Sequence, residues 1–124
     1  MSAEFDPVKQ TVVYHDAINA LDFATIEASF AEDAVYVSGG VGGRIEGREA
    51  IMAAFRSYFA TYPDQVAEDT EIEAVGENAV RAVWRLTASH SETGEKLIRT
   101  GEETVTFNAD GRIIRVDVTD YGAK

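Results

Sequence analysis

Residues 79–121 read AVRAVWRLTASHSETGEKLIRTGEETVTFNADGRIIRVDVTDY, and this stretch decides the fold. Its composition predicts three consecutive antiparallel strands at residues 79–89, 96–108 and 112–121. Turn sequences separate these strands: Glu-Thr-Gly forms the tip of the first hairpin, and Asn-Ala-Asp-Gly connects the second strand to the third. The rest of the chain is expected to pack against one face of this meander.

Side chains of the meander alternate between an apolar face and a polar face, as they do in a half-buried sheet. The apolar face is expected to meet the helices, and we call it the inner face. The alternation also places Arg99, Glu103 and Asp120 on the inner face and Ile113 on the outer one. The apolar residues expected on the inner face are Val80, Ala82, Trp84, Leu86, Ala88, Leu97, Val105, Phe107, Ile114, Val116 and Val118.

Glu103 and Asp120 are the informative exceptions, because burying an unpaired carboxylate costs free energy. In one interpretation Glu103 pairs with Arg99 or another arginine, and Asp120, near the end of the chain, reaches water. In the other interpretation both carboxylates line a pocket with Tyr14 and take part in proton transfer or hydrogen bonding. The sequence leaves both interpretations open.

The chain before the meander begins with a predicted helix. Asp6 and Pro7 mark its start, since aspartate caps free amides and proline fits the first helical position, and it is expected to run to about Ala20. Tyr14 lies on the apolar stripe of this helix and points inward. His15 lies about 100° around the helix from Tyr14 and is expected to be exposed.

Further elements complete an α+β fold in which three helices pack on a curved antiparallel sheet. Glycines between the first two strands are expected to turn the chain back as a hairpin, and their spacing does not match a phosphate-binding loop. The length fits a single domain over residues 1–124. Helices are predicted at residues 23–30 and 47–60, and strands at residues 34–38, 44–46 and 66–75.

The composition argues against several classes of function. A net charge of −11, from 22 acidic and 11 basic residues, repels phosphate backbones and anionic membranes, so neither nucleic acid nor a membrane is an expected partner. The chain has no cysteine and two histidines without metal-ligand spacing, so no metal site is predicted. No signal peptide or long apolar run is found, and a cytoplasmic location is expected.

Short motifs occur in a characteristic order along the chain. They are Tyr-His-Asp-Ala-Ile-Asn-Ala-Leu-Asp (14–22), Phe-Ala-Glu-Asp-Ala-Val-Tyr-Val (30–37), Glu-Gly-Arg-Glu-Ala-Ile (46–51) and Phe-Asn-Ala-Asp-Gly-Arg-Ile-Ile-Arg (107–115). With them, nearly the whole chain resembles the nuclear transport factor 2-like superfamily, especially its SnoaL-like and ketosteroid isomerase-like members. The resemblance implies a cone-shaped curved sheet, packed on three helices, that encloses an apolar cavity, commonly in a homodimer.

The resemblance also implies roles for single residues. In ketosteroid isomerases a tyrosine of the first helix and a protonated aspartic acid bind the oxyanion, while another aspartate is the base. Tyr14 stands at the tyrosine position, and Glu103, counted back from Phe107, stands at that of the protonated acid. The base position is Ser38, whose hydroxyl cannot remove a carbon-bound proton at neutral pH without a base of its own. Ketosteroid isomerase activity as such is therefore not expected.

Other members of the superfamily suggest other uses of the same cavity. SnoaL-like cyclases hold an acidic base deep inside it, a position for which Asp120 and Glu103 are both candidates. Relatives that hydrolyse limonene epoxide use an arginine between two aspartates. Arg99 with Glu103 and Asp120 has the ingredients of such a site, which two separate strands would have to bring together. The predicted catalytic residues are thus Tyr14, Glu103 and Asp120, without a cofactor. Predicted substrate contacts are Ser38, Phe55, Trp84, Arg99, Val116 and Val118.

Two functions follow as hypotheses. The first is a small-molecule pocket protein of SnoaL-like type, with acid/base catalysis of isomerase, cyclase or hydrolase type on an apolar, carbonyl-bearing compound. The alternative is a non-catalytic binding or dimeric assembly module of the same fold. A homodimer is predicted through the outer face of the meander, which is rich in β-branched residues. This face combines Arg81, Val83, Arg85, Ile98, Thr100, Thr104, Thr106, Ile113 and Arg115.

Overall fold

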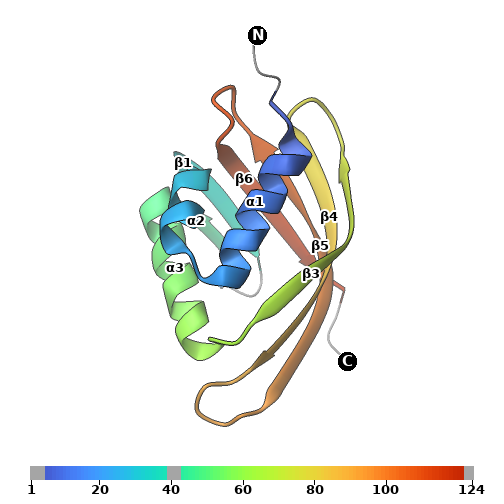
Figure 1. Ribbon diagram of the computed structural model, residues 1–124. Coiled ribbons are helices and arrows are strands. Elements are labelled where there is room, and N and C mark those ends of the chain that lie inside the picture. Colours follow the sequence, from blue (N-terminus) through green and yellow to red (C-terminus); the bar gives the residue numbers. More distant parts are fainter. Residues whose placement is uncertain (1–4, 39–42, 122–124) are drawn as a thin grey trace.

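The computed structural model describes residues 5–38 and 43–121, and its elements confirm the predicted order (Figure 1). Glycines 39, 40 and 42, expected to turn the first hairpin, lie outside the described residues. In chain order the elements are α1 (Pro7–Ala20), α2 (Phe23–Ser29), β1 (Phe30–Ser38), β2 (Gly43–Glu46), α3 (Arg48–Thr61), β3 (Val66–Ala74), β4 (Ala79–Ser89), β5 (Lys96–Phe107) and β6 (Ile113–Asp120).

Helix α1 begins as its sequence predicts. The Asp6 carboxylate accepts hydrogen bonds from the amides of Val8 and Lys9, at 3.1 and 3.2 Å, and Pro7 occupies the first helical position. The helix ends where Leu21 adopts the left-handed conformation, with φ at 56°. These local signals fix both ends of α1 and thereby the place of the side chains that it carries into the interior.

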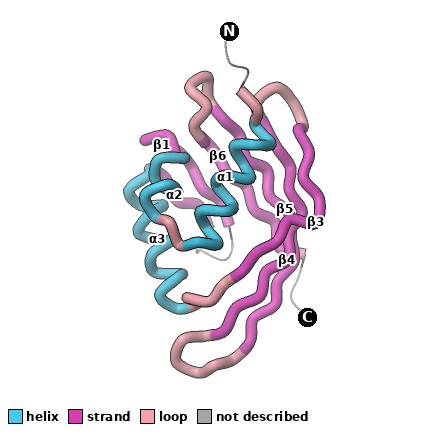
Figure 2. Tube along the Cα trace, in the orientation of Figure 1, coloured by secondary structure: helices cyan, strands magenta, loops and turns pink. Residues whose placement is uncertain are grey.

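The described strands form one sheet in the order β2-β1-β6-β5-β4-β3. The sheet curves around α1, and the three helices lie on its concave side, as Figures 1 and 2 show. The predicted α+β cone is confirmed. The sheet is mixed rather than wholly antiparallel, because β1 pairs with β6 in parallel. The long connection between these two strands, through α3 and the meander, allows the chain to return in the same direction.

The meander has the predicted inner face except at the start of β6, where the facing of Ile113 and Ile114 differs from the prediction. Thr106 pairs with Arg115, whereas Phe107 pairs with Ile113, so the register shifts by one residue between them. Such a bulge reverses the facing of the residues before it. Ile113 is therefore fully buried and Ile114 only half-buried, and the expectation that Ile114 points inward was wrong.

The hydrophobic core lies between the helices and the strands β1, β6 and β5, with the start of β4. Phe30 is at its centre and packs edge-on against Tyr14, Tyr36 and Phe55, with ring centroids 5.4 to 6.5 Å apart. Such aromatic pairs add to the free energy of area burial. Among the described residues, no helix is long and apolar enough to cross a membrane.

Candidate functional site

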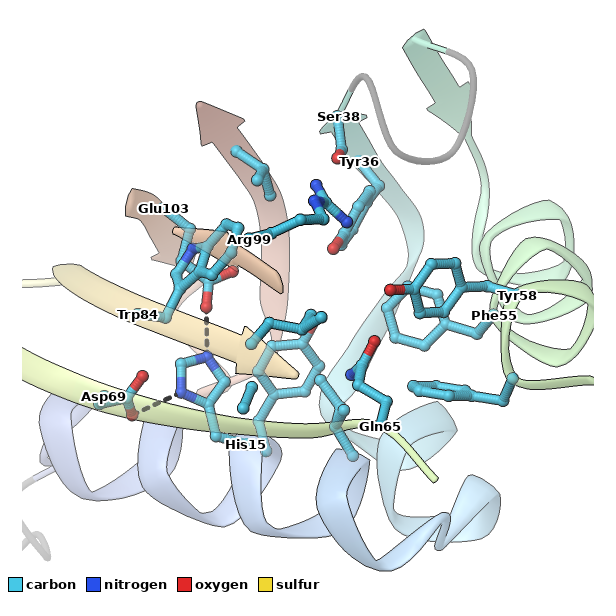
Figure 3. Close-up of a pocket in the computed structure, with 16 residues that line it drawn as sticks. His15, Tyr36, Ser38, Phe55, Tyr58, Gln65, Asp69, Trp84, Arg99 and Glu103 are labelled. Carbon is cyan, nitrogen blue, oxygen red and sulfur yellow. Dashed lines mark hydrogen bonds and ion pairs between the residues drawn. The ribbon is translucent and has the colours of Figure 1, made fainter. Parts of the chain in front are cut away.

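A cavity of about 110 Å³ lies between the helices and the inner face of the sheet. Aromatic and aliphatic side chains make up much of its wall, and ionisable or amide side chains project into it from α1, α3 and the strands (Figure 3). A cavity of this size has room for more than one water molecule, so it can admit a small ligand. The polar groups fall into separate sets.

The first set, which we call the charged cluster, consists of Asp69, His15 and Glu103. The Nδ1 atom of His15 lies 2.7 Å from an oxygen of Asp69, and its Nε2 atom contacts Oε1 of Glu103. The three residues come from β3, α1 and β5, respectively. They are largely buried, with side chains 20%, 14% and 9% exposed in the same order. An imidazole is thus held between two carboxylates on one side of the cavity (Figure 3).

Strand β3 brings Asp69 to His15 because it is fastened to α1. The Asn19 side chain donates to the carbonyl of Ala67 at 2.8 Å and accepts from the amide of Ala67 at 2.9 Å. This reciprocal pair of bonds holds β3 against α1. The strand therefore covers the side of the helix that carries His15, which lies outside the apolar stripe. The expectation that His15 is exposed was therefore wrong.

His15 is a cation in the neutral pH range. Burial by itself lowers the pKa of this imidazole, but the charge of Glu103 and the hydrogen bonds that the ring donates to Asp69 and Glu103 together raise the pKa to about 10. A protonated imidazole donates through both ring nitrogens, and each donation here meets a carboxylate oxygen. The cluster then carries one net negative charge, on carboxylates whose positions are fixed by the ring.

Two tyrosines lie next to Glu103 in the cavity wall. Burial, followed by the nearby Tyr36 and Glu103, raises the pKa of Tyr14 well above its ordinary value, and burial and Glu103 likewise raise the pKa of Tyr36. Both hydroxyls therefore keep their protons. Tyr36 is near enough to affect Tyr14, yet the Tyr14 hydroxyl makes no hydrogen bond of normal geometry within the described chain. Such a buried unpaired group costs about 1–3 kcal/mol.

Arg99 and Asp120 form an ion pair near the charged cluster but separate from it. Their closest atoms are 2.6 Å apart, and the Arg99 guanidinium lies over the Trp84 ring, 5.5 Å from its centroid. Trp84 in turn lies against Gly101, where an added Cβ would come within 2.7 Å of the ring. Gly101 thus lets the indole lie flat against β5 and form part of the cavity wall. Asp120 is exposed and is not part of that wall.

The opposite side of the cavity carries Tyr58, on α3, and Gln65, in the loop after it; we call these two residues the neutral side (Figure 3). The Oε1 atom of Gln65 is buried and has no hydrogen-bond partner among the residues that the structure describes. The buried Tyr58 hydroxyl makes no hydrogen bond of normal geometry with them, and its oxygen lies close to the Arg99 guanidinium. Burial raises the pKa of Tyr58, and the nearby Arg99 partly offsets this rise. The neutral side therefore presents an unused acceptor, the Oε1 atom of Gln65, and a Tyr58 hydroxyl whose proton is free to be donated.

The structure brings together most of the residues that the sequence suggests as a site. Tyr14, Ser38, Phe55, Trp84, Arg99, Glu103 and Val118 line the cavity. Val116 lies in the hydrophobic core and Asp120 pairs with Arg99, so neither of these predicted site residues lines the cavity. His15, which was expected to be exposed, also lines the cavity, together with Asp69, Tyr58 and Gln65, which were not predicted as site residues.

The polar groups of the cavity do not make a metal centre. Across residues 5–38 and 43–121, no three histidine, aspartate or glutamate side chains are arranged to hold a metal ion. In the charged cluster both nitrogens of His15 already meet carboxylates, so neither ring nitrogen is available as a ligand. What the arrangement offers chemically is a carboxylate fixed beside two tyrosine hydroxyls.

Comparisons with known proteins agree with this architecture. The sequence profile of the SnoaL-like domain family matches residues 12–116. RV0760c from Mycobacterium tuberculosis, solved in complex with estradiol-17beta-hemisuccinate, is 18% identical with a TM-score of 0.81, covering 94% of this chain and 93% of that one. IdmH from Streptomyces antibioticus, for which a polyketide cyclase role has been suggested, is 22% identical with a TM-score of 0.81, covering 94% and 92%.

A third solved structure has a different chemistry in its name. SalBIII, an epoxide hydrolase/cyclase-like enzyme of pyran ring formation in the polyether salinomycin, is 19% identical with a TM-score of 0.80, covering 90% of this chain and 88% of that one. Among curated proteins, none matches the sequence. At these identities the structural likeness establishes the fold, and chemistry has to be argued from the cavity of this chain.

Proposed function

The chain belongs to the SnoaL-like domain family, and we propose that it binds an apolar, carbonyl-bearing small molecule in its cavity and catalyses cofactor-free acid/base chemistry on it. The observation that carries the proposal is Glu103, a buried carboxylate of the cavity wall that His15 holds in place beside two protonated tyrosines. Similar structures support this substrate class, since RV0760c was solved with a bound steroid ester and SalBIII is described as an epoxide hydrolase/cyclase-like enzyme.

Glu103 acts as the general base in the proposed reaction. It takes a proton from the carbon next to the carbonyl group, the C–H electron pair forms an enolate, and Tyr14 and Tyr36 donate hydrogen bonds to the enolate oxygen. Return of the proton to another carbon gives an isomer. Attack of the enolate carbon on a second carbonyl of the same molecule gives a ring, with the proton passing to the new alkoxide.

His15 and Asp69 are positioning residues in this scheme. The imidazolium donates to Oε1 of Glu103 and is itself fixed by Asp69, so the Glu103 carboxylate has one orientation. A base with a fixed orientation lowers the entropy that must be lost on reaching the transition state. The position of Asp120, outside the cavity wall and paired with Arg99, favours Glu103 over Asp120 as the base.

Hydrogen exchange into a simple ketone tests the proposal without knowledge of the natural substrate. 1-Tetralone is incubated with the protein in D₂O, and deuterium at the carbon next to the carbonyl is followed by mass spectrometry. Exchange above the buffer rate is expected for the wild type and is expected to fall to the buffer rate for Glu103→Gln. Glu102→Gln is the matched control, because Glu102 directly precedes Glu103 on β5 but accepts a hydrogen bond from Arg81 rather than from His15. Equal exchange with wild type and Glu103→Gln would overturn the proposal.

A second candidate function is assembly without catalysis, and the outer face of the sheet favours it. Val66, Thr87 and Ile98 are cross-strand neighbours on β3, β4 and β5, and the side chains of Val66 and Ile98 are 52% and 53% exposed. This row fits the proposed homodimer surface. Light scattering should give the mass of a dimer at micromolar concentration and that of a monomer for Ile98→Glu. A monomeric wild type would remove the dimer from the proposal.

A further inference from the structure

We propose that the neutral side of the cavity, Tyr58 with Gln65, binds a hydroxyl group of the substrate. This inference rests on the proposed function and deepens it, because it names the substrate class. The substrate would then be a hydroxylated carbonyl compound in which the hydroxyl group and the reacting carbonyl lie at opposite ends of the molecule.

Unused hydrogen-bonding atoms are the first support. Gln65 is only 6% exposed, and its Oε1 atom has no partner among the described residues. The buried hydroxyl of Tyr58 makes no hydrogen bond of normal geometry within the described chain, and the nearby Arg99 can only donate to its oxygen, so the Tyr58 proton is available to a ligand. Both residues line the cavity, and Figure 3 shows the hydroxyl of Tyr58 and the amide of Gln65 turned toward its interior. Buried polar atoms are nearly always satisfied by protein, water or ligand, so an occupant of this part of the cavity is expected to bond both.

The chemistry of the two atoms selects the occupant. A side-chain carbonyl oxygen accepts hydrogen bonds only, so Gln65 requires a donor on the ligand. The Tyr58 hydroxyl retains its proton and lies near the positive charge of Arg99, which favours its acting as a donor to the ligand. A hydroxyl group can donate to Gln65 and accept from Tyr58 at once. A carboxylate offers no donor to Gln65, and an ammonium group offers no acceptor to Tyr58.

The position of the pair sets the geometry of the substrate. Tyr58 comes from α3 and Gln65 from the loop before β3, whereas Glu103 comes from β5 and His15 from α1. Figure 3 shows these two pairs on opposite sides of the cavity. The aromatic rings of Phe55 and Trp84 also line the cavity and provide apolar contact for the body of the ligand. A carbonyl group placed at Glu103 therefore leaves the far end of the ligand at Tyr58 and Gln65.

Binding of matched ketones tests the subsite. The probes are 6-hydroxy-1-tetralone and 7-hydroxy-1-tetralone, each compared with its methyl analogue of similar shape. Trp84 is the single tryptophan of the chain and lines the cavity, so quenching of its fluorescence measures the dissociation constants. At least one hydroxyl compound is expected to bind about tenfold more tightly than its methyl analogue, the value of one net hydrogen bond.

Three variants separate the subsite from the rest of the cavity. In Gln65→Leu and in Tyr58→Phe, the hydroxyl compound and its methyl analogue are expected to bind with about equal dissociation constants, so the preference for the hydroxyl compound is lost. Tyr62→Phe is the control, because Tyr62 packs 5.2 Å from Tyr58 but does not line the cavity, and it is expected to keep the wild-type ratio. If Gln65→Leu does not fold, Tyr58→Phe alone decides. The inference is overturned if the wild type shows no preference, binds none of the probes, or keeps its preference in both variants.

The same assay separates this inference from the proposed function. Glu103→Gln is expected to keep the hydroxyl preference, because Glu103 lies on the other side of the cavity. A protein that prefers the hydroxyl compounds but does not exchange hydrogen into 1-tetralone would retain the subsite and lose the proposed catalysis. A protein that exchanges hydrogen but shows no preference would retain the catalysis and lose the subsite.

Discussion

The charged cluster and the neutral side face the same cavity and satisfy their polar groups in opposite ways. In the charged cluster, His15 meets a carboxylate at each ring nitrogen, so the protein itself supplies the partners. On the neutral side, the Oε1 atom of Gln65 has no partner in the described chain, and the Tyr58 hydroxyl makes no hydrogen bond of normal geometry there. Burying charge without a counter-charge costs far more than burying a neutral group without a hydrogen bond. Charge is therefore paired in advance, while neutral groups can be left for a ligand.

Removing the base should produce the largest effect. Glu103→Gln is expected to lower turnover of a ketone substrate by a factor of about 10²–10⁴, since the amide cannot accept the proton. The dissociation constant for a hydroxyl-bearing ketone should change far less, because the neutral side is intact. Steady-state kinetics and fluorescence titration measure the two quantities separately. An equal loss of turnover and binding would show that the two sides are not independent.

The cation of the charged cluster should matter most for stability. His15→Gln leaves Asp69 and Glu103 close together without a positive charge between them, and it is expected to lower the free energy of unfolding by about 3–5 kcal/mol at neutral pH. Urea denaturation measures this change. Asn19→Ala is a useful comparison, because it loosens β3 from α1 and leaves the charges in place. A loss below about 1 kcal/mol for His15→Gln would contradict the account.

The same cation predicts how stability depends on pH. The pKa of His15 is about 10 in the folded protein and 6.5 in an unfolded chain, so the folded state binds the proton more tightly. The contribution of His15 to the free energy of unfolding is complete below pH 6.5 and is lost as the pH rises toward 10. The free energy of unfolding should fall by up to about 5 kcal/mol over this range. His15→Gln should remove most of this slope. Equal slopes for the variant and the wild type would contradict a charged His15.

Tyr14 should affect catalysis more than folding. Tyr14→Phe removes a buried hydroxyl that has no hydrogen bond of normal geometry with the described residues, so the free energy of unfolding should stay unchanged or rise, by up to about 1–3 kcal/mol. Loss of one donor to the enolate oxygen should lower turnover by a factor of about 10². Thermal denaturation and kinetics test the two parts. A strongly destabilised variant would place the hydroxyl in the core rather than in the site.

The smallest effect is expected at Asp120. Asp120→Asn weakens a half-exposed ion pair with Arg99, which is worth about 1 kcal/mol or less, and it leaves the cavity wall intact. Turnover should therefore change by less than about threefold. Kinetics of Asp120→Asn beside Glu103→Gln test which carboxylate is the base. A larger loss at Asp120 would reverse the proposed assignment.

The fold follows from local patterns that a single sequence contains. Alternation in residues 79–121 predicts the meander and its inner face, and Asp6 with Pro7 predicts the start of α1. The bulge near Ile113 is not predictable in this way, because it depends on how two strands are paired. The alternation of side chains along one strand does not show where an extra residue is inserted, because a bulge is defined only by the pairing with the neighbouring strand.

The site was only partly predictable for a similar reason. Glu103 stands out as an acid on an apolar face, and Tyr14 as a tyrosine on an apolar stripe. His15 gives no such signal, because its burial is created by β3, a strand more than 50 residues away that Asn19 fastens to α1. One clue was available: Asp69 shares its strand face with Ala67, so a carboxylate points toward whatever Ala67 covers.

The protonation state of His15 is the most direct test of the charged cluster. The chain has two histidines, so the imidazole signals in an NMR titration can be assigned with a His90→Gln variant. We predict that His15 remains fully protonated at pH 8 and titrates near pH 10, and that Glu103→Gln lowers this pKa. Loss of the His15 proton below pH 8, with no change in Glu103→Gln, would contradict the account of Glu103 as a base oriented by a buried cation.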